Sequence, residues 1–395
     1  MDGSLVGLTV ALTTEFVTSS DGSMAAIVGN CSTIIVRSHF NLHPVGPMGL
    51  FVKNLEALIN DGIARRIPDL LCNRLKRLIE GQTPRLLRRL TRLDVGKNVA
   101  ERIVTENPAV NDFISNLVDG LYIDNANVAQ PIITDDFLET QNRGEFRYNR
   151  QTELSPFFPK PMRITTKSDR MLHFYASDYL FNSMLYHAYQ MNNLHMQFSA
   201  DNLPKEFGSF LSTTCAPREL CIGRMIPPLG KRFPNTTASF VLISHGLPDF
   251  KFSNDSAIVQ LSMRVLTYVK ENGRQRQVIV SSADGDAEVL LSVEGDNLSG
   301  ELKLRTLDVR LHRTAIEGIH SQSFAQLAPL AKTFIGPHLS DALKRGIPFP
   351  LKDMMKLVDP KVRRHEGFIE LSTDFQLNES AFRKTVRETF ADVNV

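Results

Sequence analysis

Hydrophobic and smaller residues alternate near the start of the chain, which is typical of β-strands. Leu8, Val10 and Leu12 are separated by single smaller residues, and a β-branched run follows at 32–36. Successive side chains of a strand point to opposite faces of a sheet, and β-branched residues fit such a surface well. The pattern therefore predicts strands within residues 5–40.

A helical repeat begins near Gly49, with apolar residues at every fourth position along one side. Pro68 is expected to bend this helix and Gly81 to end it. Thirty helical residues would be roughly 45 Å long, so the apolar side must lie against something of similar length. The repeat consists of Leu55, Ile59, Ile63, Ile67, Leu71, Leu75 and Ile79, with Leu58, Leu70 and Leu78 beside it.

A proline-rich segment separates this pattern from a second one of the same kind. Pro156, Pro159 and Pro161 lie close together without glycine, which predicts a stiff linker. Short strands are expected before it, near 120–122 and 144–146. Beyond it the pattern predicts strands at 172–175, 259–265, 289–294, 300–311, 355–362 and 368–377, and helices at 179–191 and 324–343.

The order of these elements indicates two similar α+β units. Strands, a long helix and further strands occur on both sides of the prolines, a weak internal repeat of about half the chain. A chain of 395 residues also exceeds one ordinary core, which favours two domains. Each unit is expected to be a curved antiparallel sheet wrapped on a long helix.

Composition and charge exclude several classes of protein. The net charge of +2 gives no overall attraction to nucleic acid or to anionic membranes. No apolar run is long enough to cross a membrane. The sequence lacks nucleophile-elbow, zinc-protease, phosphate-loop and dinucleotide motifs. We therefore expect a protein that is not an enzyme and has no metal or cofactor.

The cysteines and the glycosylation sequons leave the compartment open. Cys31 and Cys72 are far apart, whereas Cys215 and Cys221 are close and lack the second ligand pair of a zinc site, which favours a small disulfide loop. Sequons occur in secreted proteins but also arise by chance, and no signal peptide is visible at the start. The sequons are Asn30, Asn235, Asn254, Asn297 and Asn378.

A basic segment at 63–92 has only Asp69 and Glu80 as acidic residues. One interpretation is a solvated helix face. The other is a contact with an anionic surface, a lipid head group or an acidic polysaccharide, through arginine forks. Nucleic acid is disfavoured because no aromatic residue is interleaved to stack bases. The candidate contact residues are Arg65, Arg66, Arg74, Arg77, Arg88 and Arg89.

Residues 176–183, Ala-Ser-Asp-Tyr-Leu-Phe-Asn-Ser, carry a family resemblance. They resemble the S-D-Y-x-F-N segment of the family of bactericidal/permeability-increasing protein, lipopolysaccharide-binding protein and the phospholipid and cholesteryl ester transfer proteins. Further similar segments occur in the same order, at 144–146, 169–171, 227–235, 300–304 and 346–351.

The resemblance implies two barrel-like units of highly curved antiparallel sheet, joined by a central sheet and the Pro-rich linker into a boomerang. The expected domains are an N-terminal barrel at 1–150, a linker at 151–168, and a C-terminal barrel with central-sheet strands at 169–395. The family's opening strands and first helix have no counterpart here, so the first barrel is expected to be incomplete. The family also implies secretion and a Cys31–Cys72 disulfide.

The function that the resemblance implies is lipid binding in an apolar tunnel, for lipid transport or innate defence. The partners would be phospholipid, lipopolysaccharide or another acyl-chain lipid, with peripheral contact to a membrane or lipoprotein surface. The alternatives are a secreted interaction protein with a vestigial tunnel, or a lipase-like enzyme. The candidate tunnel residues, which could also be ordinary core, are Leu180, Phe181, Met184, Leu185, Ala188 and Met191.

Overall fold

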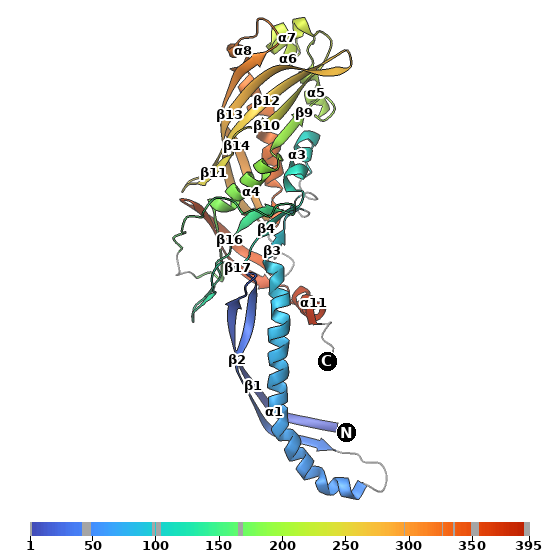
Figure 1. Cartoon of the computed structure of the whole chain (residues 1–395), viewed down its shortest axis with the longest axis vertical. Helices are drawn as coiled ribbons and strands as arrows, with labels where there is room; N and C mark the ends of the chain where they lie inside the picture. The colour runs from blue at the N-terminus through green and yellow to red at the C-terminus, as the bar shows by residue number, and fades with distance from the viewer. Residues whose placement is uncertain are drawn as a thin grey trace. The chain divides into compact units, whose positions relative to one another are not determined.

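The computed structural model combines α-helices with antiparallel sheets, which confirms the predicted α+β class (Figure 1). It describes residues 2–41, 49–96, 99, 104–164, 169–295, 297–325, 327–334, 336–348 and 355–390. The chain divides into two compact units. The first consists of Met1–Arg92, Asn125–Arg143 and Arg383–Val395, and the second of Leu93–Asp124 and Gly144–Phe382.

The first unit is built on a long antiparallel hairpin. β1 (Asp2–Thr18) pairs with β2 (Met24–Asn41) from Asp2↔Asn41 to Thr18↔Met24, so the strands predicted within residues 5–40 are confirmed. Gly22 lies in the turn at φ +76°, a conformation that glycine adopts without the strain of a side chain. A second, short hairpin joins β5 (Ile132–Ile133) to β6 (Leu138–Glu139).

One helix, α1 (Gly49–Leu87), accounts for the repeat of apolar residues and packs against β2. It continues through Pro68 and Gly81, so the predicted end at Gly81 is wrong. A glycine inside a helix costs only about 1 kcal/mol, which tertiary packing can offset. The short helix η1 (Arg88–Leu90) follows directly. The side chains of Ile59 and Ile63 lie outside what the structure describes.

A disulfide between Cys31 and Cys72 ties β2 to α1, as the resemblance implied. Next to it, the backbone N–H of Val28 donates to Glu80 Oε1 of α1 at 3.1 Å. Ala26 and Val28 of β2, the strand that packs against α1, are buried. The disulfide and this hydrogen bond therefore add to the packing of the helix on the hairpin.

Many apolar side chains of the first unit are exposed. Val36 of β2 is 70% exposed and Leu58 of α1 is 72% exposed. Among the described residues the unit has only two-stranded sheets, and neither unit contains a closed barrel. The domain boundaries expected at 1–150 and 169–395 stay a prediction. The two compact units divide the chain differently, since residues 93–124 and 144–150 belong to the second unit.

A seven-stranded antiparallel sheet forms the body of the second unit (Figure 1). Its order is β15, β14, β13, β12, β10 and β9, with β11 also paired to β12. The hairpin predicted around residues 295–297 is present, although both strands are longer than predicted. The strands are β9 (His195–Phe198), β10 (Ala238–Ser244), β11 (Asp249–Phe252), β12 (Ala257–Glu271), β13 (Arg274–Glu294), β14 (Asn297–Thr314) and β15 (Ile347–Pro348).

Two three-stranded sheets complete the strands of this part of the chain. One has the order β16, β17, β8, and its strands β8 and β17 lie where the sequence predicts them. The other has the order β3, β4, β7. Their bounds are β3 (Arg92–Asp94), β4 (Leu121–Asp124), β7 (Glu145–Tyr148), β8 (Leu172–Ser177), β16 (Met355–His365) and β17 (Phe368–Leu377).

Helices cover the sheets of the second unit. The helix predicted at 179–191 is α4, which begins directly after β8 and packs against β7 and β11. The last helix among the described residues is α11 (Glu379–Phe390), whose residues from Arg383 onward belong to the first unit. The other helices are α3 (Pro108–Val118), α4 (Asp178–Gln190), α5 (Lys205–Gly208), η2 (Ser209–Leu211), α6 (Ile222–Met225) and α7 (Pro227–Arg232).

The helix predicted at 324–343 falls on three helical segments, α8 (Ser321–Ala325), α9 (Leu327–Phe334) and α10 (Gly336–Lys344). Gln326 and Ile335, which lie between these segments, are outside the described residues. The helical structure predicted for the described part of 324–343 is therefore confirmed.

The proline-rich segment has no helix or strand in its described part, 151–164, and part of it packs on α4. Ser155 is buried, and the ring of Phe157 contacts the ring of Tyr186 edge-on at 5.7 Å between centroids. Residues 165–168 of the predicted linker lie outside the described residues, as do 349–351 of the resemblance. The segment is therefore part of the second unit where it is described.

The remaining disulfide and the sequons are placed as follows. Cys215 is bonded to Cys221, with 6.2 Å between their Cα atoms, so both predicted pairings are confirmed. Asn297 is half-buried at the start of β14. The other four sequon asparagines are exposed, which leaves room for a glycan, and they are Asn30, Asn235, Asn254 and Asn378.

Candidate functional site

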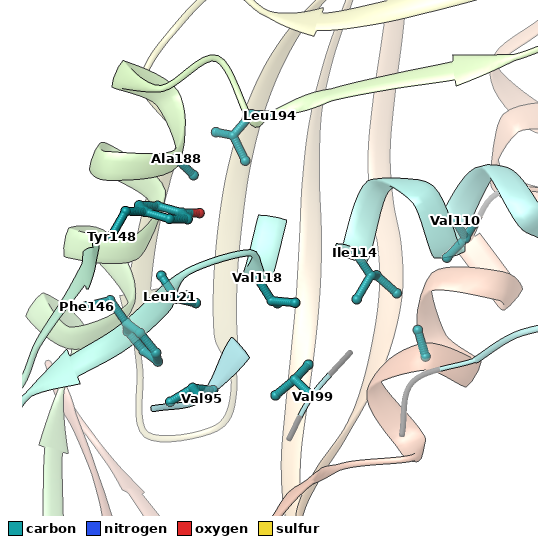
Figure 2. Close-up of a cluster of buried hydrophobic side chains, with 11 residues drawn as sticks. Val95, Val99, Val110, Ile114, Val118, Leu121, Phe146, Tyr148, Ala188 and Leu194 are labelled. Carbon is teal, nitrogen blue, oxygen red and sulfur yellow. The ribbon is translucent and has the colours of Figure 1, made fainter. Parts of the chain in front are cut away.

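Helix α4 presents its predicted tunnel residues to two different apolar clusters. Leu180, Ala188 and Met191 lie at the first cluster, which also includes α3 and β7 residues (Figure 2). Phe181 and Leu185 lie at the second, against β11. Met184 contacts both clusters. The helix therefore separates two cores, and the six residues do not form one continuous stripe.

The first cluster covers one side of α4 with aliphatic and aromatic side chains. Figure 2 shows Ala188 of α4 near Tyr148 and Phe146 of β7, with Leu194 just beyond the helix. Burial raises the pKa of the Tyr148 hydroxyl to about 12, so this group stays neutral at physiological pH. The buried members are Val95, Val99, Val110, Ile114, Val118, Leu121, Phe146, Tyr148, Ala188, Leu194 and Ala342.

Three phenylalanines dominate the second cluster. The ring of Phe181 stacks on Phe250 at 4.5 Å between centroids and meets Phe252 edge-on at 5.6 Å. Asn182 fixes this arrangement through a pair of backbone contacts. Its Nδ2 donates to the carbonyl of Phe250 at 2.8 Å, and its Oδ1 accepts from the Phe250 N–H at 2.8 Å. The asparagine of the S-D-Y-x-F-N segment thus joins β11 to α4.

A buried polar pair connects α4 to β7. His187 Nε2 is 3.0 Å from Glu145 Oε1, and the same oxygen accepts the Ser155 N–H at 2.6 Å. Both side chains are buried, and Glu145 Oε2 has no hydrogen-bond partner among the described residues. Close by, the Phe146 N–H donates to Ser183 Oγ at 3.0 Å. These contacts connect β7, the proline-rich segment and α4.

The ionised form of Glu145 is favoured despite its burial. Burial raises the pKa of the Glu145 carboxyl. The hydrogen bonds from His187 and the Ser155 N–H, together with the charges of His187 and Arg147, lower this pKa by more than burial raises it. The net pKa is below the ordinary value of 4.5. Glu145 is thus an ionised, structural acceptor in this contact, and we assign the pair no chemistry.

Sequence reasoning missed the Glu145–His187 pair. The segment 144–146 predicts a short strand and carries part of the resemblance but indicates no polar partner, and His187 has no characteristic spacing. The Asp169-Arg170-Met171 segment also has a role that the sequence did not indicate. Arg170 forms ion pairs with Asp359 and, at 2.7 Å, with Asp374. It thereby anchors the entry to β8 on the β16–β17 hairpin.

The six candidate arginines are exposed in the first unit, along α1 and η1. From Arg65 to Arg88 the helical rise corresponds to roughly 35 Å, so the set is an extended row and not a compact anion site. Arg65 pairs with Asp61 at 2.6 Å, and Arg88 pairs with Asp21 at 2.6 Å. Whether this row contacts an anionic surface stays a prediction.

The second unit also has a polar hollow of about 290 Å³ between α3 and β9. Asp112, Asn116 and His195 are among its lining residues, so it differs from the apolar tunnel that the resemblance implied. Within the described ranges, no three His, Cys, Asp or Glu side chains are placed to hold a metal ion. No helix there is both long and apolar enough to cross a membrane.

Comparison with known proteins shows the family. The model of the LBP / BPI / CETP family, C-terminal domain, matches residues 116–377, which is more than half of the chain. The chain therefore belongs to this family. The match includes α4, the Glu145–His187 pair and the seven-stranded sheet.

Individual relatives are distant. Bactericidal permeability-increasing protein of Sebastes schlegelii is 22% identical over 63% of this chain and 52% of that protein. Lipopolysaccharide-binding protein of Bos taurus is 24% identical over 64% and 52%, and that of Homo sapiens is 20% identical over 95% and 72%. The chain spans about half the length of the first two. A crystal structure of lipopolysaccharide binding protein aligns with 95% of this chain over 76% of the length of that protein chain, with 18% sequence identity and a TM-score of 0.43.

Proposed function

We propose that this chain is an extracellular, non-enzymatic protein that holds phospholipid or lipopolysaccharide-type lipid for lipid transport or innate defence. The observation that carries the proposal is the family match over residues 116–377. Two of the relatives are named for lipopolysaccharide binding. The two disulfides support an oxidising, extracellular compartment.

The apolar surroundings of α4 are the region proposed to hold the acyl chains. Each methylene removed from water contributes about 0.8 kcal/mol, so a lipid needs no catalytic group to be held tightly. Met184 lies between the two clusters, and Leu180, Phe181 and Met191 are only partly buried. These side chains would separate from their neighbours to admit an acyl chain.

A secreted interaction protein with a vestigial tunnel is the second candidate. It is favoured by the dense packing on α4, where Ala188 is fully buried and Leu185 is nearly so. Extraction of lipid from the purified protein distinguishes the two candidates, because a protein with a vestigial tunnel would return no lipid.

The change Leu185→Asp should abolish lipid loading. It places a carboxylate in the cluster of Phe250 and Phe252, where an acyl chain would have to lie. Lipid extracted from the purified variant, measured per mole of protein, should fall at least about tenfold. Gln190→Asp, at the exposed end of the same helix, adds the same charge and should retain the lipid.

Met184→Gln covers the case in which Leu185→Asp does not fold. It keeps the length of a side chain that contacts both clusters and adds only an amide. Its lipid content should also fall. Lipid content equal to that of the unchanged protein, in a folded Leu185→Asp or Met184→Gln variant, would exclude α4 from the site.

A further inference from the structure

Basic residues gather at one end of the large sheet in the second unit. At this end β12 turns into β13, and helices α6 and α7 lie beside the turn (Figure 1). The loop closed by the Cys215–Cys221 disulfide precedes α6. We call residues 215–235, 270–276 and 315–320 the basic end.

The basic end is a built surface. Thr236 joins the loop region to the sheet, because its N–H donates to Thr213 Oγ1 at 3.1 Å and its hydroxyl donates to the carbonyl of Lys270 at 2.8 Å. Arg224 Nη1 donates to the carbonyl of Glu219 at 3.2 Å and also to that of Pro217. The disulfide loop is therefore held on both sides.

Close backbone packing fixes the loop further. A Cβ added to Gly223 would lie 1.7 Å from the carbonyl oxygen of Thr213, so only glycine fits there. Across the surface, Gly318 lies next to Pro228 of α7, with 3.7 Å between the Pro228 side chain and the position that a Cβ would take. The segment 315–320 thus borders α7.

The charge of this end differs from that of the whole chain, in which 45 basic residues face 43 acidic ones. The three segments contain Glu219, Glu271 and Glu317 as their only acidic residues, and Arg276 pairs with Glu271 at 2.7 Å. All basic side chains are exposed, and they are Arg218, Arg224, Lys231, Arg232, Lys270, Arg274 and Arg276.

An exposed leucine lies among these charges. Leu220, inside the disulfide loop, is 51% exposed although its neighbour Cys221 is fully buried. A soluble polyanion would use the cations alone and leave such a side chain in water. An anionic bilayer attracts Lys and Arg to its phosphates and also accepts apolar side chains below the head groups.

We propose that the basic end docks on the surface of an anionic phospholipid membrane, with its Arg and Lys side chains at the phosphates and Leu220 in the interface. This goes beyond the proposed function, since it concerns the outside of the unit and not the lipid held within it. The docking needs no bound lipid, so it can fail while the proposed function holds, and the reverse.

The test is flotation of the intact protein with phosphatidylcholine vesicles that contain or lack phosphatidylserine. The protein should bind only the anionic vesicles, and added salt should weaken the binding because it screens the charges. Asn235 is an exposed sequon at this end, so each measurement is made before and after enzymatic removal of N-glycans. Binding should be at least as strong without glycans.

Two variants locate the surface. Arg218→Glu/Lys231→Glu/Arg232→Glu should weaken binding at least about tenfold. The matched control, Arg150→Glu/Lys356→Glu/Arg363→Glu, reverses three exposed charges elsewhere in the second unit and should bind normally. Leu220→Ser should weaken binding, whereas Leu247→Ser, at a leucine that is 40% exposed in another loop, should not.

These variants change exposed side chains, and circular dichroism and thermal melting check that each one folds. The proposal is overturned if the unchanged protein does not float with anionic vesicles, or if the two triple variants bind equally. Retention on a heparin column without any vesicle binding would also overturn it, in favour of an acidic polysaccharide.

Discussion

Replacing His187 by alanine should lower the free energy of unfolding of the second unit by about 3 kcal/mol. Among the described residues, the change leaves the Ser155 N–H as the one hydrogen-bond donor to the buried Glu145 carboxylate, because the second carboxylate oxygen has no partner there. A buried charge that loses its partner is strongly destabilising. Chemical denaturation, followed by hydrogen exchange to assign the loss to β7 and α4, measures the effect.

His195→Ala is the matched control, because His195 is only half-buried and its hydrogen bond, 2.8 Å from Nδ1 to the carbonyl oxygen of Asn192, is exposed to solvent. Its effect should stay below about 1 kcal/mol. An equal loss of unfolding free energy in both histidine variants would show that the contact with Glu145 does not stabilise the fold more than an ordinary hydrogen bond.

The Glu145 pair also predicts a dependence on pH. The pKa of Glu145 is lower in the folded protein than its ordinary value of 4.5. Its contribution to stability is therefore complete above that value and declines as the pH falls below it, because the unfolded chain then binds the proton more readily. Glu145→Gln should reduce the slope of stability against pH in this acidic range. An unchanged slope would contradict the assignment.

Removing the first disulfide should have an effect of similar size in the first unit. Cys31→Ser/Cys72→Ser opens a loop with a sequence separation of 41, which costs about 4 kcal/mol on the chain-entropy model. None of the described side chains of α1 is buried, so the disulfide should provide a large share of what holds the helix on β2. Hydrogen exchange should show α1 and β2 losing protection together.

Cys215→Ser/Cys221→Ser is the control for this second prediction. Its sequence separation is only 6, so the same model gives about 2 kcal/mol. The loss should be confined to the second unit. Full protection of α1 after removal of Cys31 and Cys72 would show that the noncovalent contacts suffice.

The sequence predicted those elements whose patterns are local. The four-residue spacing of α1, the alternation in β12 and the turn residues between β13 and β14 each specify an element within a few residues. The ends of these elements were not specified as closely, since α1 continues past Gly81 to Leu87. Whether a helix continues past a glycine depends on packing that the local pattern does not contain.

The division into units and the polar contacts could not be predicted in this way. Glu145 and His187 are 42 residues apart, and Arg170 and Asp374 are 204 apart, so only the folded chain brings them together. The lipid-binding role of the six α4 residues stays a prediction. That they divide between two clusters depends on β11 and β7 reaching opposite sides of the helix.

Lipid binding is the central claim, and native mass spectrometry of the purified protein tests it most directly. The intact protein should carry mass beyond its polypeptide and any glycans, and denaturation should release that mass as an acyl-chain lipid. We expect a single lipid per chain, held in the second unit. A spectrum of lipid-free protein, unchanged after incubation with phospholipid and with lipopolysaccharide, would contradict the account.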